Sequence, residues 1–162
     1  MKYFFTADMH MGHSNIIKYC NRPFGTVQEM DWALIKNWNS VVTENDIVFH
    51  IGDFAFKNFD AFKELLHGQI IFIKGNHDEE NKIIIEDCVI NFNQKNIYLN
   101  HFPDLCKAEY NLCGHIHGKW KTKVEDGKYI INVGCDVWNY KPVSLQQIME
   151  EFKHMKNQEV KR

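Results

Sequence analysis

Five clusters of acidic, amide and histidine side chains occur in this 162-residue chain, and each follows directly on a short apolar run. Carboxylate, carboxamide and imidazole groups are the ligands that hard to borderline divalent metals prefer. The clusters, in order, are Asp8-Met9-His10, Gly52-Asp53, Gly75-Asn76-His77-Asp78, His101 and Gly114-His115-Ile116-His117.

The runs that precede these clusters are rich in Ile, Val, Phe and Tyr, which is typical of buried strands. Open α/β sheets bind their ligands beyond the carboxyl ends of the strands. We therefore expect the clusters to converge at one edge, although they lie far apart in the sequence. A converging set of aspartate, asparagine and histidine side chains predicts a site for two metal ions.

The order D-x-H, G-D, G-N-H-D, H and G-H-x-H resembles the calcineurin-like metallophosphoesterase superfamily. The resemblance runs from Asp8 to His117 and on to about Val143, which is most of the chain. One D-x-H alone would carry no weight, whereas all five clusters in order form a specific pattern. The flanking segments 11–17 and 132–138 are similar to those of the small single-domain bacterial and phage members.

The resemblance implies which side chain binds which ion. Asp53 would bridge the two ions, because the two oxygens of a carboxylate can contact both. One ion site would be completed by an acid and two histidines: Asp8, His10 and His117. The other would be completed by an amide oxygen and two histidines: Asn76, His101 and His115. Mixed nitrogen and oxygen ligands favour Mn²⁺, with Fe, Zn, Ni or Co as alternatives.

The resemblance also implies a catalytic histidine that is not a ligand. His77 would face the phosphate, stabilise developing charge and protonate the leaving oxygen. Asp78 would orient the ring of His77 and raise its basicity. His50, which lies inside an apolar run, is interpreted as a core or supporting residue.

Three residues that follow the first ligand pair are candidate substrate contacts: His13, Asn15 and Arg22. The guanidinium of Arg22 is suited to forked contact with phosphate. The alternative is a loop held by side-chain hydrogen bonds, and the sequence favours neither.

Phe54-Ala55-Phe56-Lys57 follows Asp53 at a place where many relatives carry another acid or an arginine. The protein-phosphatase branch uses that arginine on phosphate, so protein dephosphorylation is disfavoured. His10 and the G-N-H-D cluster resemble those of cyclic-nucleotide diesterases and nucleases. The resemblance thus implies a phosphodiesterase for small, cyclic or nucleotide diesters, acting by in-line attack of a metal-bound hydroxide.

Three alternatives stay open: a nuclease for single strands or ends, a broad phosphomonoesterase, and a non-catalytic metal-binding scaffold. The net charge of −2 and the pI of about 6.5 disfavour non-specific binding to long nucleic acid. Five cysteines without a C-x-x-C pair, no signal-peptide core and no apolar stretch of ~20 residues indicate a cytoplasmic protein without membrane contact.

The pattern predicts a single α/β domain over residues 1–162. Thr26-Val27-Gln28-Glu29 is a capping-box pattern that opens a helix over residues 27–42. Further helices are expected over residues 59–66 and from Ser144, with a tail that frays from about residue 157. The first half alternates strand and helix, as parallel units do, and residues 88–133 are strand-rich with antiparallel pairing expected. The resemblance implies a four-layer α/β/β/α sandwich of two mixed sheets flanked by helices.

Overall fold

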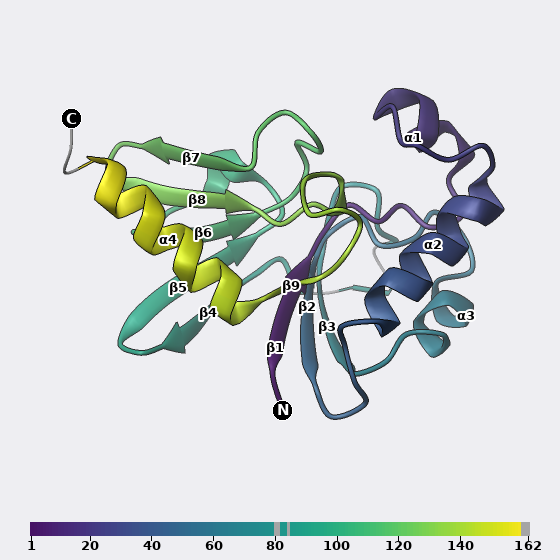
Figure 1. The fold of residues 1–162 in the computed structure, drawn as a ribbon, viewed down its shortest axis with the longest axis horizontal. Coiled ribbons are helices and arrows are strands. Elements are labelled where there is room, and N and C mark those ends of the chain that lie inside the picture. Colours follow the sequence, from purple (N-terminus) through teal and green to yellow (C-terminus); the bar gives the residue numbers. More distant parts are fainter. Residues whose placement is uncertain (80–81, 84, 160–162) are drawn as a thin grey trace.

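The computed structural model describes residues 1–79, 82–83 and 85–159, which form two mixed β-sheets with flanking helices (Figure 1). The first sheet has the strand order β3-β2-β1-β9. Its strands are β1 (Tyr3–Thr6), β2 (Ile47–Ile51), β3 (Gln69–Ile73) and β9 (Val143–Ser144). β1, β2 and β3 are parallel, and β9 pairs with β1 antiparallel. The prediction of parallel strands in the first half is confirmed.

The second sheet has the strand order β4-β5-β6-β8-β7. Its strands are β4 (Asp87–Phe92), β5 (Lys95–Asn100), β6 (Tyr110–Cys113), β7 (Thr122–Glu125) and β8 (Lys128–Asn132). The β4–β5 and β7–β8 hairpins are antiparallel as expected. The pairs β5–β6 and β6–β8 are parallel, so the prediction was wrong for them. Turn signals identify hairpins, but they do not show how one hairpin lies against the next.

Four α-helices accompany the sheets: α1 (Ser14–Tyr19), α2 (Val27–Asn39), α3 (Phe59–Glu64) and α4 (Leu145–Glu159). α2 begins where the capping pattern predicted, and Thr26 Oγ1 accepts the N–H of Glu29 at 3.1 Å. α1 was not expected. The predicted fraying from residue 157 is wrong as far as Glu159, whose carboxylate accepts the Tyr129 hydroxyl.

Two large apolar clusters separate the layers. The inner faces of both sheets share one cluster, which includes Phe5, Ile51, Leu99, Leu112 and Ile131. The apolar stripe of α4 joins this same cluster through Leu145, Ile148, Phe152 and Met155. The outer face of the first sheet packs against α2 in the second cluster, which includes Val48 of β2 and Leu34 and Trp38 of α2. The predicted sandwich of two mixed sheets flanked by helices is confirmed.

The carboxyl ends of the strands carry the five clusters that the sequence analysis singled out. β1, β2, β3, β5 and β6 end one to four residues before the ligand candidates of each cluster. Backbone hydrogen bonds then tie the clusters to one another, from Asp8 N to Gly52 O and from Gly114 N to His101 O, both at 3.0 Å. An isolated parallel bridge between Ala7 and Gly134 joins the two sheets just beyond β1 and β8.

In the described part of the chain, every helix is too short or too polar to form a transmembrane span.

We expect Phe152→Ala to lower the free energy of unfolding by about 3–5 kcal/mol, because its ring is buried among both sheets and contacts Tyr110. The exposed neighbour on the same helix, in Lys153→Ala, should change it by less than about 0.5 kcal/mol. Urea denaturation followed by circular dichroism measures both. A similar small effect for the two variants would show that α4 is not part of the central core.

Candidate metal centre

Five of the candidate ligands adopt left-handed backbone conformations. The φ angles are 57° at Asp8, 50° at His10, 59° at Asp53, 71° at His115 and 47° at His117. Such values are uncommon for residues other than glycine, and each costs on the order of 1–3 kcal/mol unless the surroundings hold it. This strain is concentrated at one edge of the fold, where functional sites store it.

Asp53 lies between the two predicted ion sites. Its Oδ2 is 3.4 Å from Nε2 of His10 and 3.4 Å from Nε2 of His101, and all three side chains are buried. Its other oxygen, Oδ1, accepts the backbone N–H of His77 at 2.9 Å. One carboxylate oxygen therefore faces a histidine from each site, which is the position that a bridging ligand needs.

The first ion site brings together ligands from the first and last clusters. Donor atoms of Asp8, His10 and His117 all lie within 4.8 Å of one another. The rings of His10 and His117 stack with centroids 5.2 Å apart. Both oxygens of Asp8 also accept the backbone N–H of His115, at 3.0 and 2.9 Å, so the two clusters are held in register.

The second ion site is arranged around the amide of Asn76. Its Oδ1 is 3.2 Å from Nε2 of His101 and 3.0 Å from Nδ1 of His115. The other ring nitrogen of His101 contacts the carbonyl of Ile51 at 2.9 Å, which orients Nε2 toward Asn76 and Asp53. A carbonyl that fixes one imidazole nitrogen while the other faces the centre is the usual support of a metal-binding histidine.

The residues present fit divalent ions at both sites. Nε2 of His10 is buried and lacks a hydrogen-bond partner among the described residues, although a buried polar atom without one is costly. An ion beside Asp53 would satisfy it. The absence of a side chain at Gly114 lets the first and last clusters approach each other closely. A Cβ at this position would lie 2.6 Å from Ala7 Cβ and 2.8 Å from Asp8 Oδ2.

Burial sets the charge state of these groups. It lowers the pKa of His10 to about 3, so this ring is neutral and able to coordinate. Burial also raises the pKa of Asp8, which the neighbouring His101 opposes, to about 6. For Asp53 burial is outweighed by the hydrogen bond and charge of His101, which hold the pKa of this carboxyl well below its usual range.

His77 and Asp78 lie on opposite sides of their loop. His77 is exposed, and its ring centroid is 5.4 Å from that of His10. Asp78 is buried, and its carboxylate accepts the backbone N–H groups of Asp53, Phe54 and Gly75 at 2.7–2.9 Å. The predicted role of Asp78 in orienting His77 is therefore wrong. Its carboxylate instead holds the backbone of Asp53.

The three candidate substrate contacts differ in position. The ring of His13 is partly exposed, stacks on Phe56 with centroids 4.7 Å apart and lies 5.8 Å from the ring of His10. Asn15 is exposed on α1. For both, contact with a substrate stays a prediction.

Arg22 does not reach the cleft, so the prediction for it was wrong. Its side chain is buried, and its guanidinium donates to the carbonyls of Asp8 and Met9 and to the carboxylate of Asp136. The alternative interpretation, a loop held by side-chain hydrogen bonds, is correct for this residue, with partners outside the loop.

Two residues that sequence reasoning did not single out support His117. Asp136 Oδ2 is 3.0 Å from Nδ1 of His117, and Asn132 Nδ2 donates to the carbonyl of His117 at 2.7 Å. Both belong to the segment 132–138, whose likeness to small family members was the available signal.

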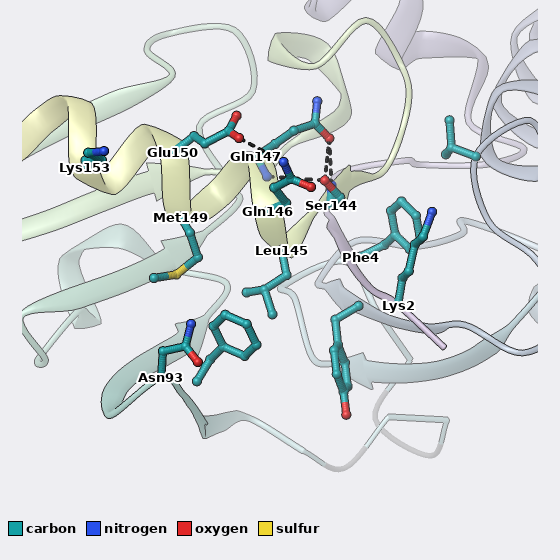
Figure 2. Close-up of a pocket in the computed structure, with 13 residues that line it drawn as sticks. Lys2, Phe4, Asn93, Ser144, Leu145, Gln146, Gln147, Met149, Glu150 and Lys153 are labelled. Atoms are coloured by element: carbon teal, nitrogen blue, oxygen red, sulfur yellow. Dashed lines mark hydrogen bonds between the residues drawn. The ribbon is translucent and has the colours of Figure 1, made fainter.

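A groove of about 760 Å³ lies at the other end of the first sheet, between α4 and the start of β1 (Figure 2). It is lined mainly by apolar side chains such as Phe4, Leu145 and Met149, with Lys2 and Lys153 beside them. None of the candidate ligands is among its lining residues, so its size does not mark it as the reactive site.

Residues 1–145 match the calcineurin-like phosphoesterase superfamily domain. An uncharacterized protein of Methanocaldococcus jannaschii is 41% identical over 164 residues, covering 92% of this chain and 90% of that protein. A solved protein of unknown function from Aquifex aeolicus superposes with a TM-score of 0.76 at 22% identity, covering 92% of this chain and 98% of that one. Vps29 of Entamoeba histolytica, solved with Zn²⁺, superposes with a TM-score of 0.52 at 21% identity. The match covers 83% of this chain and 74% of that one.

We expect Mn²⁺ binding to release protons at neutral pH. Burial lowers the pKa of His117, but the hydrogen bond to Asp136 outweighs it and raises this pKa to about 10. At pH 7 the ring is thus protonated before an ion binds, and coordination displaces about one proton from His117, so affinity rises with pH.

Calorimetry in buffers of different ionisation enthalpy measures this release. The release should be smaller in His117→Gln by the proton that His117 no longer contributes, which separates this contribution from ionisation of coordinated water. An equal release in wild type and variant would show that His117 does not give up the proton.

Proposed function

The chain belongs to the calcineurin-like phosphoesterase superfamily, and from this premise we propose that it is a dinuclear metal-dependent phosphodiesterase for small, cyclic or nucleotide diesters. The observation that carries the proposal is the position of Asp53 Oδ2, 3.4 Å from a histidine of each trio. A carboxylate shared in this way serves two ions that act on one phosphate.

Each ion would be held by three side chains in addition to Asp53. The first set is Asp8, His10 and His117, and the second is Asn76, His101 and His115. Divalent ions there would supply Lewis acidity toward the phosphate oxygens and would lower the pKa of a coordinated water. The mixture of imidazole and oxygen ligands favours Mn²⁺ over Mg²⁺ or Ca²⁺.

His77 supplies the chemistry that the ligands do not. Its backbone N–H donates to Asp53 Oδ1 at 2.9 Å, and this hydrogen bond holds His77 close to Asp53. Its exposed ring lies 5.4 Å from the ring of His10, beside the edge where a phosphate would enter. From that place an imidazole donates a hydrogen bond to a phosphate oxygen and passes a proton to the leaving oxygen.

Aromatic side chains border the same edge. His13 and the half-exposed Phe56 stack nearly parallel, at an interplanar angle of 16°. Such a pair offers a flat surface to the base or aryl group of a diester. The preference for diesters rests on charge as well. A monoester carries an additional negative charge that a guanidinium would balance, and Arg22 is already bound within the protein.

We expect kcat/KM for bis(p-nitrophenyl) phosphate and 2′,3′-cyclic nucleotides to exceed that for p-nitrophenyl phosphate when the metal-free protein is reconstituted with Mn²⁺. The guanidinium of Arg22 is bound to the carbonyls of Asp8 and Met9 and to Asp136, so it does not balance the extra charge of the monoester. Colorimetric and chromatographic assays at one pH and metal concentration measure this, with Asp53→Asn as the inactive control. Asn suits the left-handed backbone at this position, so the control tests the lost charge.

Each other outcome points to a different function. Equal or faster turnover of the monoester would replace the diesterase with a broad phosphomonoesterase. Preferred cleavage of single-stranded oligonucleotides would indicate a nuclease. Binding of Mn²⁺ without turnover of any ester would favour a metal-binding scaffold.

His77→Asn should lower kcat for the cyclic diesters by ~10²–10⁴ while Mn²⁺ stoichiometry stays at the wild-type value, because the ring acts on the phosphate and not on the ions. The loss should be smaller for aryl diesters, whose leaving groups need no proton. His154→Asn, at an exposed histidine on α4, is the matched control. A fall in bound Mn²⁺ in His77→Asn would show that His77 is a ligand.

A further inference from the structure

All three guanidinium nitrogens of Arg22 donate hydrogen bonds beside the candidate metal centre. Nη2 donates to the carbonyl of Asp8 at 2.6 Å, and Nη1 donates to the carbonyl of Met9 at 2.9 Å. Nε and Nη2 contact the two oxygens of Asp136 at 2.8 and 3.0 Å, which is a forked ion pair. The side chain of Arg22 is fully buried in this pair.

The two carbonyls belong to the strained segment that carries the first ligand pair. Asp8 and His10 both have positive φ, at 57° and 50°. Positive φ at such residues persists only where surrounding contacts hold the backbone. Charge-assisted hydrogen bonds from a buried guanidinium are stronger than hydrogen bonds between neutral groups, which suits them to hold this backbone.

The same guanidinium reaches the third ligand through Asp136. Asp136 Oδ2 accepts from Arg22 and is 3.0 Å from Nδ1 of His117. A carboxylate on one imidazole nitrogen fixes the ring and its tautomer, and leaves the other nitrogen free for an ion. Arg22 is therefore in contact with the backbone of Asp8 and Met9 and, through one carboxylate, with the ring of His117.

We propose that Arg22 and Asp136 form a positioning pair that assembles one of the two ion sites, the one made by Asp8, His10 and His117. The inference rests on the proposed dinuclear function and assigns to it two residues that touch neither ion nor substrate. Cys20 also lies beside His117 and Asp136. A third ion at that place is disfavoured, because both oxygens of Asp136 already face a guanidinium.

The other ion site depends on different supports. The carbonyl of Ile51 contacts Nδ1 of His101. The side-chain oxygen of Asn76 contacts Nε2 of His101 and also Nδ1 of His115. None of these contacts involves Arg22 or Asp136. Loss of the positioning pair should consequently weaken one Mn²⁺-binding step and spare the other, which a general destabilisation of the fold would not do.

The test measures both Mn²⁺ dissociation constants by titration of the metal-free protein, with free Mn²⁺ followed by electron paramagnetic resonance. His117→Ala identifies the step that belongs to the first site, and His115→Ala identifies the other. We expect Asp136→Asn to weaken the first step by about 10–100-fold and to leave the second unchanged. Arg22→Lys keeps the charge but lacks the fork, so it should weaken the same step.

Asp46→Asn is the matched control. Asp46 is also buried and accepts the backbone N–H groups of Lys2 and Thr43, but it lies at the opposite end of the first sheet. The Asp46→Asn substitution should lower the melting temperature of the metal-free protein without changing either Mn²⁺-binding step. The rise in melting temperature caused by Mn²⁺ gives a second readout for variants of low stability.

Equal weakening of both steps in Asp136→Asn, or of neither, would overturn the inference. So would selective weakening in Asp46→Asn. Because the readout is binding of Mn²⁺, a wild-type protein that hydrolyses none of the esters contradicts the proposed function and leaves this inference to be decided by the titration.

Discussion

The structure depends on keeping ionised carboxylates in a buried place. Asp53 is 3% exposed, Asp8 is fully buried, and Asp78 lies directly beneath the loop of Asp53. Isolated buried charges are very costly, and neighbouring charges of the same sign add to the cost. Hydrogen bonds from backbone N–H groups to the carboxylates of Asp8 and Asp78 offset part of this cost. In the proposed metal centre, two dications would offset much of the remainder, and their binding would then stabilise the fold.

Much of the fold and the positions of the ligands could be predicted from the sequence, because each cluster directly follows a strand. Strands of a parallel sheet end at one edge, so Asp8, Asp53 and Asn76 had to meet once the first half was interpreted as parallel. The capping pattern at Thr26 predicted the start of α2 for an equally local reason. Such local signals do not depend on which distant segments come into contact.

The wrong predictions concern side chains whose partners are set by tertiary packing. Asp78 is adjacent to His77 in sequence, but the turn directs its carboxylate inward to three backbone N–H groups. Arg22 was a candidate phosphate contact because its guanidinium suits forked contact with phosphate, and a role in side-chain hydrogen bonds was the open alternative. Its actual partner, Asp136, is 114 residues away. No periodicity or spacing within one segment encodes such a pair.

The bridge between Ala7 and Gly134 has a consequence for how the packing of the core acts on the site. It joins the two sheets one residue before Asp8, so the spacing of the candidate ligands is tied to the packing of the core. A change that shifts one sheet against the other would therefore displace the candidate ligands relative to one another. The segments bearing α1 and Phe56 lie outside this bridge, and a second bridge between Met11 and Ala55 joins the residues just before them. Substitutions in those exposed segments would leave the bridge between the sheets in place.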